Sequence, residues 1–242
     1  MACHYAKWTL SDTMPDVRRL NPELVAAAAA FSVKRRQRYL YGRVLLAEMM
    51  AYFYGIPLLP KMITPPSGRP CFADTNLPDF SLAYAGNTLG VMLSSEGKVG
   101  LDMEVIRARS SRILQLHKEN LSSAELAWVA EQNEPMEAAT QLWCIRQSIL
   151  KLSGLGNSGL ETVRLHPASG RLRSSVLPDV QVASDSDSLF AWACAQSPTL
   201  GRMVQWRFHP DRGFSQIQEN AQQPLSSHFM KQIGRASCRE RV

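Results

Sequence analysis

Residues 99–104 alternate between apolar and polar positions, a pattern that predicts a half-buried strand. Asp102 and Glu104 occupy two of the polar positions. Because side chains two residues apart on a strand point to the same face, the two carboxylates are expected side by side. Like charges held so close raise the pKa of one carboxyl group unless a cation lies between them. The segment therefore predicts either a site for a divalent cation or the ordinary solvated acidic face of a strand.

Two stretches of the first half carry the helical period. Pro22, preceded by the capping residue Asn21, predicts the start of a short Ala-rich helix over 22–31. A longer helix is expected from about residue 34 to residue 54, where Gly55 supplies the left-handed conformation that ends many helices. Its expected buried stripe consists of Leu40, Val44, Ala47 and Ala51.

Strand patterns follow these helices. Residues 80–84 and 89–93 are predicted to form a hairpin around a Gly-Asn turn. We expect the strand over 99–104 to extend this hairpin to a three-stranded antiparallel meander.

The second half begins with two further helices. Ser122 and Glu125 form a capping-box pattern that opens a helix to about residue 132, and capping alone accounts for Glu125. A longer helix is predicted over 135–153, where Gly154 ends it. Strands are predicted near 161–166, 171–173, 181–183, 189–195 and 203–208.

Segregated helices and antiparallel strands indicate an α+β fold. We expect an N-terminal half over 1–98 and a C-terminal half over 99–210 that carries the metal ligands. Gln, Ser and Asn dominate from residue 211 onward, so 211–242 is expected to be a disordered tail. Within this tail, 233–242 resembles the conceptual translation of a widely used sequencing adapter, and we interpret it as an assembly artefact.

Composition places the chain among ordinary globular proteins. Hydrophobic residues make up 45% and charged residues 20% of the 242 positions, which suffices for one large or two small cores. No run approaches the length of a membrane span, and the N-terminus lacks the pattern of a secretory leader, so a cytoplasmic protein without a membrane partner is expected. The five cysteines are scattered without metal-ligand spacing and are expected to be reduced packing thiols.

A basic cluster opens the longer N-terminal helix. Four basic side chains lie within residues 34–38, and Arg43 shares a helix face with Arg36, seven residues before it. Three interpretations stay open: a nucleic-acid patch, a site for anionic phosphates, and a solvated helix end. Nucleic acid is the weakest of these, because the cluster has no interleaved aromatic residues and the net charge of the chain is only +6.

The helix predicted over 135–153 carries a second candidate constellation. Trp143, Gln147 and Lys151 are spaced four apart and therefore lie along one helix face. Taken singly, Trp143 is explained by core packing and Lys151 by the preference of cations for the C-terminal end of a helix.

These segments occur in a recognisable order along the chain. The order is the basic helix, Gly-Arg-Pro at 68–70, Phe-x-x-x-Tyr at 80–84, Gly-x-Asp-x-Glu at 100–104 and Trp-x-x-x-Gln-x-x-x-Lys at 143–151. It resembles the surfactin-synthetase-activating type of 4′-phosphopantetheinyl transferase over about residues 30 to 200. The resemblance implies two similar α+β halves in one chain, with the active site in the cleft between them. It also implies transfer of the phosphopantetheine arm of coenzyme A to a serine of an apo acyl or peptidyl carrier protein, with Mg²⁺ bound and 3′,5′-ADP released.

The strand motif of this family is intact around Asp102 and Glu104, which the resemblance implies as Mg²⁺ ligands. The third metal-associated position falls on Gln147, where the family has glutamate. Glu104, Gln147 and Lys151 occupy the catalytic positions, with Lys151 countering the charge that develops on phosphate.

The resemblance also implies a set of coenzyme contacts. Arginine suits the bidentate grip of phosphate that these positions require. The implied contacts are Arg38, Arg43, Arg69, Pro70, Tyr84 and Lys151.

Several positions depart from the family pattern. Arg69 replaces a lysine and keeps its charge, Arg146 replaces the lysine before Gln147, and Ala83 replaces a serine. Tyr84 replaces a histidine, and its phenol is expected to donate a hydrogen bond to a phosphate or to pack against pantetheine. The segment 121–125 resembles a Phe-Ser-x-x-Glu motif, with leucine in place of phenylalanine.

Two alternatives from other classes remain open. A catalytically weakened relative would bind carrier protein or coenzyme A without efficient transfer, as Tyr84 and Gln147 suggest. A basic nucleic-acid-binding module built on residues 34–43 is the weaker alternative. The favoured interpretation is a monomeric enzyme whose partners are coenzyme A and a carrier protein, without nucleic acid.

Overall fold

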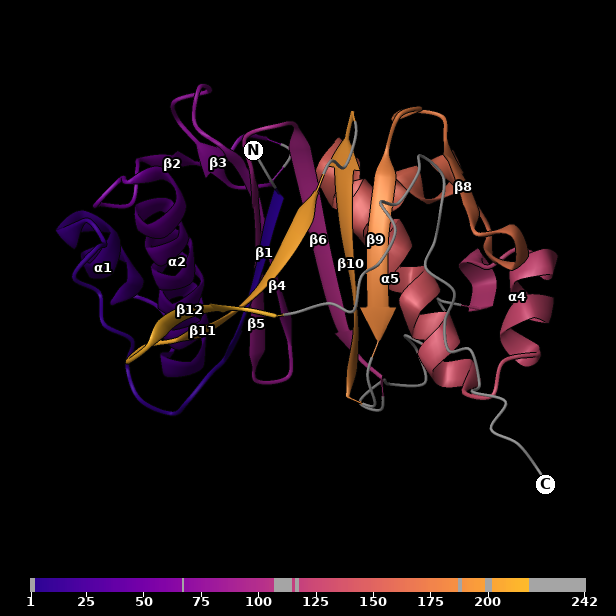
Figure 1. The fold of residues 1–242 in the computed structure, drawn as a ribbon, viewed down its shortest axis with the longest axis horizontal. Coiled ribbons are helices and arrows are strands. Elements are labelled where there is room, and N and C mark those ends of the chain that lie inside the picture. Colours follow the sequence, from indigo (N-terminus) through magenta and orange to yellow (C-terminus); the bar gives the residue numbers. More distant parts are fainter. Residues whose placement is uncertain are drawn as a thin grey trace. The chain divides into compact units, whose positions relative to one another are not determined.

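The structure is a computed structural model that describes residues 3–66, 68–106, 115, 118–186, 189–198 and 202–217. The described chain falls into two units, of which the first comprises residues 3–101 with 202–217 and the second comprises residues 102–198. Each unit combines helices with its own strands (Figure 1).

The first unit contains most of the N-terminal elements and the last two strands. Their bounds are β1 (Cys3–Thr9), α1 (Pro22–Ala28), α2 (Val33–Tyr54), β2 (Met62–Ile63), β3 (Cys71–Phe72), β4 (Asp79–Ala85), β5 (Thr88–Ser94), β11 (Met203–His209) and β12 (Gly213–Gln216). The strand β6 (Lys98–Val105) begins in this unit and ends in the second.

A five-stranded sheet with the order β12-β11-β1-β5-β4 forms the centre of the first unit. β1 pairs antiparallel with β5 and parallel with β11, and β4 pairs antiparallel with β5. The helix α2 covers one face of this sheet (Figure 1). Burial of each large apolar side chain between helix and sheet contributes about 1.5–3 kcal/mol, so this layer is the main source of stability in the unit.

The helix α2 begins at Val33, one residue before its predicted start, and ends at Tyr54 as predicted. Its C-cap Gly55 has a φ of 68°, a left-handed conformation that is costly for residues with a Cβ atom. The apolar side chains of the helix, among them Leu40, Leu45 and Met49, are buried in the core of the unit.

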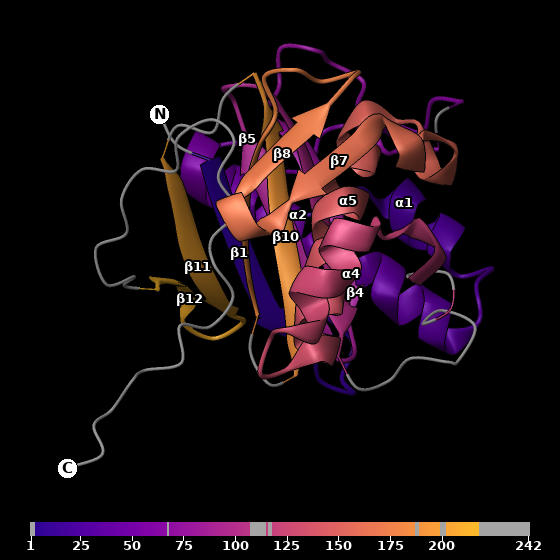
Figure 2. The same ribbon diagram turned by 90° about the vertical axis from the view of Figure 1, so that its right-hand side faces the viewer.

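The second unit contains the remaining elements. Their bounds are α4 (Ser123–Ala130), α5 (Pro135–Ser153), the 3₁₀ helix η1 (Gly156–Thr162), β7 (Val163–His166), the 3₁₀ turn η2 (Pro167–Ser169), β8 (Arg171–Ser174), β9 (Gln181–Ser186) and β10 (Phe190–Ser197). A three-stranded sheet has the order β6-β10-β9, and β7 and β8 form a separate antiparallel hairpin (Figure 2).

The helix α5 supplies the core of the second unit. Leu142, Ile145 and Ile149 are fully buried and cluster with Val182 and Ala193 of the sheet. Proline occupies the first turn of the helix, and Gly154 ends it with a φ of 75°. Both signals are local, which explains why the sequence predicts the bounds of this helix correctly.

The α+β class is confirmed, but the expected antiparallel meander is wrong. β6 does not extend the β4–β5 hairpin and instead lies in the sheet with β10 and β9. The parallel pairing of β1 with β11 also departs from the expectation of purely antiparallel sheets. Both differences involve partners far apart in the sequence, which local patterns do not specify.

The expected domain boundaries also need correction. β11 belongs to the sheet of the first unit, although residues up to 210 were assigned to the C-terminal half. β12 lies within the stretch 211–242 that was expected to be disordered, and it pairs with β11. The remainder of that stretch, including 233–242, lies outside the described residues. Among the described residues, no helix has both the length and the hydropathy to cross a membrane.

Candidate functional site

The prediction that β6 is half-buried is wrong, because residues 99–103 are buried on both faces of the strand and Asp102 is buried with them. Val99 and Leu101 are fully buried, whereas Glu104 is half-buried. Asp102 is only 6% exposed, an unusually low value for a carboxylate. A carboxylate this far from solvent needs a cation or hydrogen-bond donors close to it.

Lys151 of α5 supplies such a cation. Its Nζ donates a hydrogen bond to Oδ1 of Asp102 over 2.8 Å. The lysine side chain remains 37% exposed while that of Asp102 is 8% exposed. The ammonium group therefore neutralises the buried carboxylate and keeps contact with solvent.

Gln147 lies one helical turn before Lys151 on the same face of α5. Its Nε2 donates a hydrogen bond to Oδ1 of Asn157, on η1, over 3.1 Å. Since the amide nitrogen is used in this contact, the amide oxygen is the atom that Gln147 offers to a cation. Trp143, one turn earlier, is buried.

The oxygen ligands that this region offers suit Mg²⁺, which also binds water and substrate phosphates, better than a metal that is held by protein side chains alone. The described residues contain no group of three or more His, Cys, Asp or Glu side chains that could hold a metal. Mg²⁺ is commonly held by one or two carboxylates together with water and substrate phosphates. The carboxylates of Asp102 and Glu104 and the amide oxygen of Gln147 are oxygen atoms of the kind that such a site uses.

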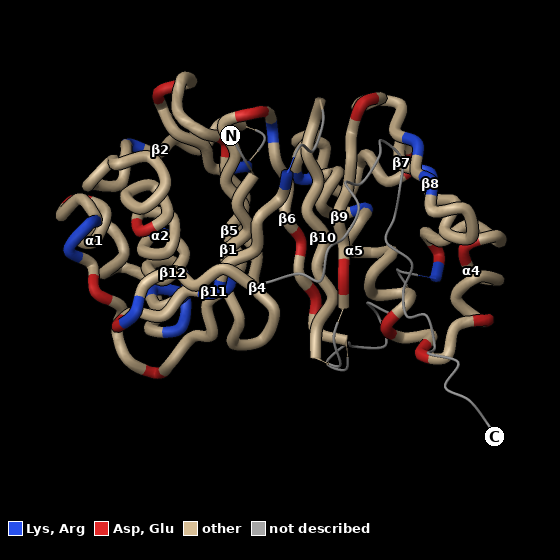
Figure 3. The backbone as a smooth tube through the Cα atoms, viewed as in Figure 1, with Lys and Arg blue, Asp and Glu red and all other residues tan. Residues whose placement is uncertain are grey.

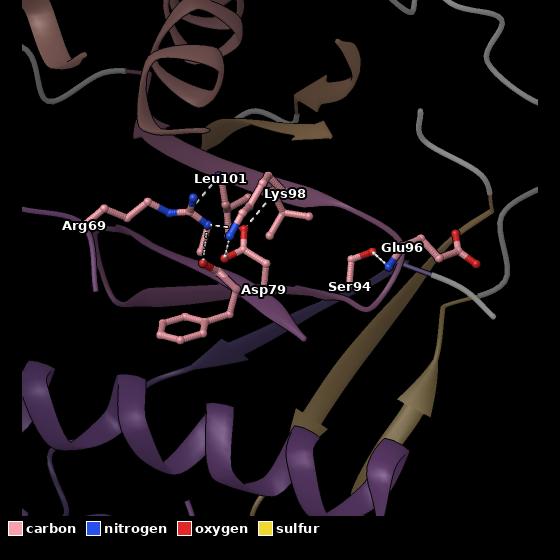
Figure 4. A network of polar contacts seen from close by, with 9 residues as sticks. Arg69, Asp79, Ser94, Glu96, Lys98 and Leu101 are labelled. Atoms are coloured by element: carbon pink, nitrogen blue, oxygen red, sulfur yellow. Dashed lines mark hydrogen bonds and ion pairs between the residues drawn. The ribbon is translucent and has the colours of Figure 1, made fainter. Parts of the chain in front are cut away.

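Two side chains of β4 fix the first half of β6. The amide of Val99 donates to Oδ2 of Asp79 over 2.8 Å, and the amide of Leu101 donates to Oγ of Ser81 over 2.9 Å. Figure 4 shows Asp79 and Leu101 within a larger polar network. The side chains of Asp79 and Ser81 thus accept the hydrogen bonds of the Val99 and Leu101 amides, which in a regular sheet would go to backbone carbonyls. Neither Asp79 nor Ser81 was identified from the sequence, because nothing local marks them as acceptors for a distant strand.

Arg69 belongs to the same network. Its Nη2 donates to Oδ2 of Asp79 over 2.5 Å and to the carbonyl of Phe80 over 2.8 Å (Figure 4). Lys98 adds a second cation 4.0 Å from Oδ1 of Asp79. Arg69 and Lys98 thus place two cations near the single carboxylate of Asp79. Pro70, which follows Arg69, is half-buried directly before β3.

A cavity of about 470 Å³ lies beside the N-terminal part of α2. It brings together three of the expected coenzyme contacts, Arg38, Arg43 and Tyr84. The other lining residues are Ser32, Lys34, Arg35, Tyr39 and Leu82. Four basic side chains on one cavity make a site for an anion with several negative charges.

Arg43 is the most constrained of these cations. Its guanidinium carbon lies 3.3 Å from the centroid of the Tyr39 ring, and Nη1 donates to the Tyr39 carbonyl over 3.2 Å. Burial lowers the pKa of Arg43 from its ordinary value. Among the described residues its buried Nε has no hydrogen-bond partner. A buried donor without an acceptor is costly, and a bound anion would relieve that cost.

Tyr84 lies on β4 and packs against α2. Its hydroxyl donates a hydrogen bond to the carbonyl of Arg38. A Cβ atom at Gly42 would lie 2.5 Å from this hydroxyl, so glycine permits the close approach of α2 to β4. Burial raises the pKa of Tyr84 to about 12, which keeps the phenol neutral at physiological pH. Arg38 lies over the ring of Tyr84 at 5.4 Å and donates to the Gly86 carbonyl over 3.1 Å.

Arg146, the residue before Gln147 on α5, forms a buried ion pair that holds two helices together. It is 2% exposed and binds both carboxylate oxygens of Glu125, at 2.5 and 2.7 Å. Glu125 also accepts the Ser122 amide in the capping box that the sequence predicts. Burial lowers the pKa of Arg146 from its ordinary value, and Glu125 opposes this shift. The pair joins α4 to α5 inside the second unit.

Comparison with known proteins identifies the family. A family model described as the 4′-phosphopantetheinyl transferase superfamily matches residues 98–192. The chain is 37% identical over 220 residues to the uncharacterized protein YieE of Escherichia coli (strain K12), covering 90% of this chain and 88% of that protein. It is 35% identical over 135 residues to the 4′-phosphopantetheinyl transferase AcpT of Salmonella typhi, covering 55% of this chain and 66% of that protein. The chain belongs to the 4′-phosphopantetheinyl transferase superfamily.

Membership in this superfamily confirms the resemblance at the level of the family. The chain is a transferase of the phosphopantetheine class, whose members use coenzyme A as a substrate and act on carrier proteins. The matched region contains both the Asp102–Glu104 strand and the helix with Gln147 and Lys151. The basic cavity on α2 lies outside the matched region.

Proposed function

We propose that this chain is a Mg²⁺-dependent 4′-phosphopantetheinyl transferase of the surfactin-synthetase-activating type. It moves the phosphopantetheine arm of coenzyme A to a serine of an apo acyl or peptidyl carrier protein and releases 3′,5′-ADP. The observation that carries the proposal is the ion pair between Lys151 and the buried Asp102 within the family motif. It places a lysine ammonium beside an acidic strand, which is what transfer between phosphate oxygens requires.

In the proposed reaction the serine oxygen of the carrier attacks the phosphorus that bears the pantetheine arm. The bond from this phosphorus to the bridging oxygen breaks, and that oxygen leaves on 3′,5′-ADP. Lys151 stabilises the negative charge that develops on the leaving phosphate. Glu104 accepts the serine proton, because the neutral amide of Gln147 cannot act as a base.

Asp102, Glu104 and the oxygen of Gln147 would hold Mg²⁺ in the proposed enzyme. When bound, the metal supplies charge neutralisation on the pyrophosphate oxygens. The basic side chains of the cavity on α2, chiefly Arg38 and Arg43, bind the phosphates of the adenosine moiety. Arg69 contributes from the Asp79 network, next to Pro70, and Tyr84 forms the wall of the cavity.

A transfer assay tests this proposal. Apo carrier proteins of the fatty-acid, polyketide and peptide types are incubated with the chain, coenzyme A and Mg²⁺. We expect one of them to gain the mass of one phosphopantetheine arm. Asp102→Ala should abolish this gain while leaving the circular dichroism spectrum unchanged. Asp179→Ala, at an exposed position of the same unit, is the matched control. Full transfer by Asp102→Ala would rule out the site assignment.

A catalytically weakened relative is the second candidate. It is favoured by Gln147, which binds Asn157 and lacks the charge of the family's glutamate, and by Tyr84, whose hydroxyl is already bonded to α2. Under this alternative, calorimetry would detect coenzyme A binding that Arg43→Ala weakens, while no carrier protein gains mass. Efficient transfer to a cognate carrier would exclude it.

A further inference from the structure

The hairpin formed by β7 and β8 has one buried and one basic face. Its inward side chains, Val163, Leu165, Leu172 and Ser174, are buried. Its outward side chains, Arg164, His166, Arg171 and Arg173, are all exposed. Each strand therefore alternates strictly, and every outward position is a basic residue type. Figure 3 colours the Lys and Arg positions of the backbone blue, and the hairpin carries several of them.

The register of the hairpin places these basic residues directly opposite one another. Arg164 pairs with Arg173, and His166 pairs with Arg171. Like charges at directly opposed positions of an antiparallel pair are destabilising. Within the part of the chain that the structure describes, none of the four takes part in an ion pair. The outer face thus lacks an internal counter-charge and lowers the stability of its own hairpin.

The size and chemistry of this face favour a protein partner over a nucleic acid. Strands of four residues extend only about 13 Å, since each residue advances about 3.3 Å. That length matches two turns of a helix with acidic residues four positions apart. Single-stranded nucleic acids are usually bound by longer basic grooves with aromatic side chains for base stacking, and no aromatic residue lies on this face.

We propose that the outer face of the β7–β8 hairpin is a docking surface for an acidic helix of a protein partner. The identification of that partner as the carrier protein rests on the proposed function. Charged residues at the rim of an interface act mainly by steering the approach of the partner, which raises the association rate constant. The surface therefore affects binding of the carrier and leaves the rate of the chemical step unchanged.

Charge reversal on one strand tests the surface without disrupting the hairpin. Arg171→Glu combined with Arg173→Glu places a carboxylate opposite His166 and Arg164, so the thermal stability should be equal or higher. The matched control is Arg207→Glu with Arg212→Glu, two exposed positions of the first unit. Both double variants change the net charge by the same amount.

The first measurement is direct binding. A fluorescent helical peptide with glutamates at every fourth position is titrated with the full chain at two salt concentrations. The hairpin variant should bind about tenfold more weakly, and the control should bind like the parent. Equal binding by all three proteins would overturn the proposal. So would tighter, hairpin-dependent binding of a single-stranded RNA of similar length.

The second measurement separates this surface from the proposed activity. In steady-state transfer, the hairpin variant should show a KM for the carrier protein raised about tenfold, with kcat and the KM for coenzyme A unchanged. An unchanged carrier KM would overturn the docking role. If the parent chain transfers nothing to any carrier, the proposed function fails, and the peptide titration decides the docking surface alone.

Discussion

Lys151 donates a hydrogen bond to Oδ1 of Asp102 over 2.8 Å, which joins the last turn of α5 to β6. The carboxylate is buried, and the ammonium group is more than one-third exposed. The ion pair therefore serves two purposes at once. It compensates a charge in the core of the second unit, and it leaves the lysine accessible to an anionic substrate.

A double-mutant cycle on Lys151 and Asp102 should show strong coupling. Lys151→Met removes the cation. The buried carboxylate of Asp102 then lacks its counter-ion, which should lower the free energy of unfolding by about 1–3 kcal/mol. Combined with Asp102→Asn, the same change should cost less, because the charge that needed the lysine is gone. The free energy of unfolding in urea, measured for the four proteins, checks this. Additive effects of the two changes would show that the pair is energetically neutral.

Restoring a glutamate on the α5 face should improve transfer. Gln147→Glu adds a negative oxygen and a possible base one turn before Lys151, and a general base typically contributes about 10²–10⁴-fold in rate. We expect faster single-turnover transfer and half-saturation at lower Mg²⁺. The control is Gln132→Glu, an exchange of the same type after the last turn of α4. If Gln147→Glu behaves like this control, Gln147 lies outside the metal shell.

The contact between Ser81 and β6 should protect the Leu101 amide. Ser81→Ala removes the acceptor of this buried N–H, at a cost of about 1–3 kcal/mol, whereas Ser81→Thr keeps a hydroxyl in place. Hydrogen exchange followed by NMR should be faster at Leu101 in the alanine variant and close to the parent rate in the threonine variant. Equal exchange in all three proteins would mean that Ser81 does not hold the strand.

Stability should decrease in mild acid because of His4. This ring stacks on Phe53 at 3.8 Å and accepts a hydrogen bond from Trp206 Nε1 over 3.2 Å. Burial lowers the pKa of His4 from 6.5 to about 4. The unfolded chain therefore binds a proton that the folded chain excludes, and stability falls as the pH drops from about 6.5 to about 4.

His4→Phe keeps the ring stacking and removes the titrating group. Tm measured between pH 7.5 and pH 4.5 should then fall less steeply for the variant than for the parent. His209→Phe, at another half-buried histidine of the first unit, is the matched control. An identical slope for His4→Phe and the parent would exclude His4 as the source of the acid sensitivity.

The sequence by itself determined the local elements and the motif residues. The C-terminal ends of α2 and α5 follow from Gly55 and Gly154, and the start of α5 follows from Pro135. The capping box of α4 follows from Ser122 and Glu125. The alternation around Asp102 predicted the strand itself, although both faces of β6 are buried over residues 99–103. These features depend on neighbours within a few residues, so their physical causes are contained in short stretches of sequence.

Only the tertiary structure decided which distant groups meet. It placed Lys151 on Asp102, Ser81 on the Leu101 amide and Arg146 on Glu125, and it paired β11 with β1. Hydrogen bonds and ion pairs of this kind are chosen by the packing of whole elements. Many residues carry the same donors and acceptors, so composition and spacing leave the choice among them open until the core has formed.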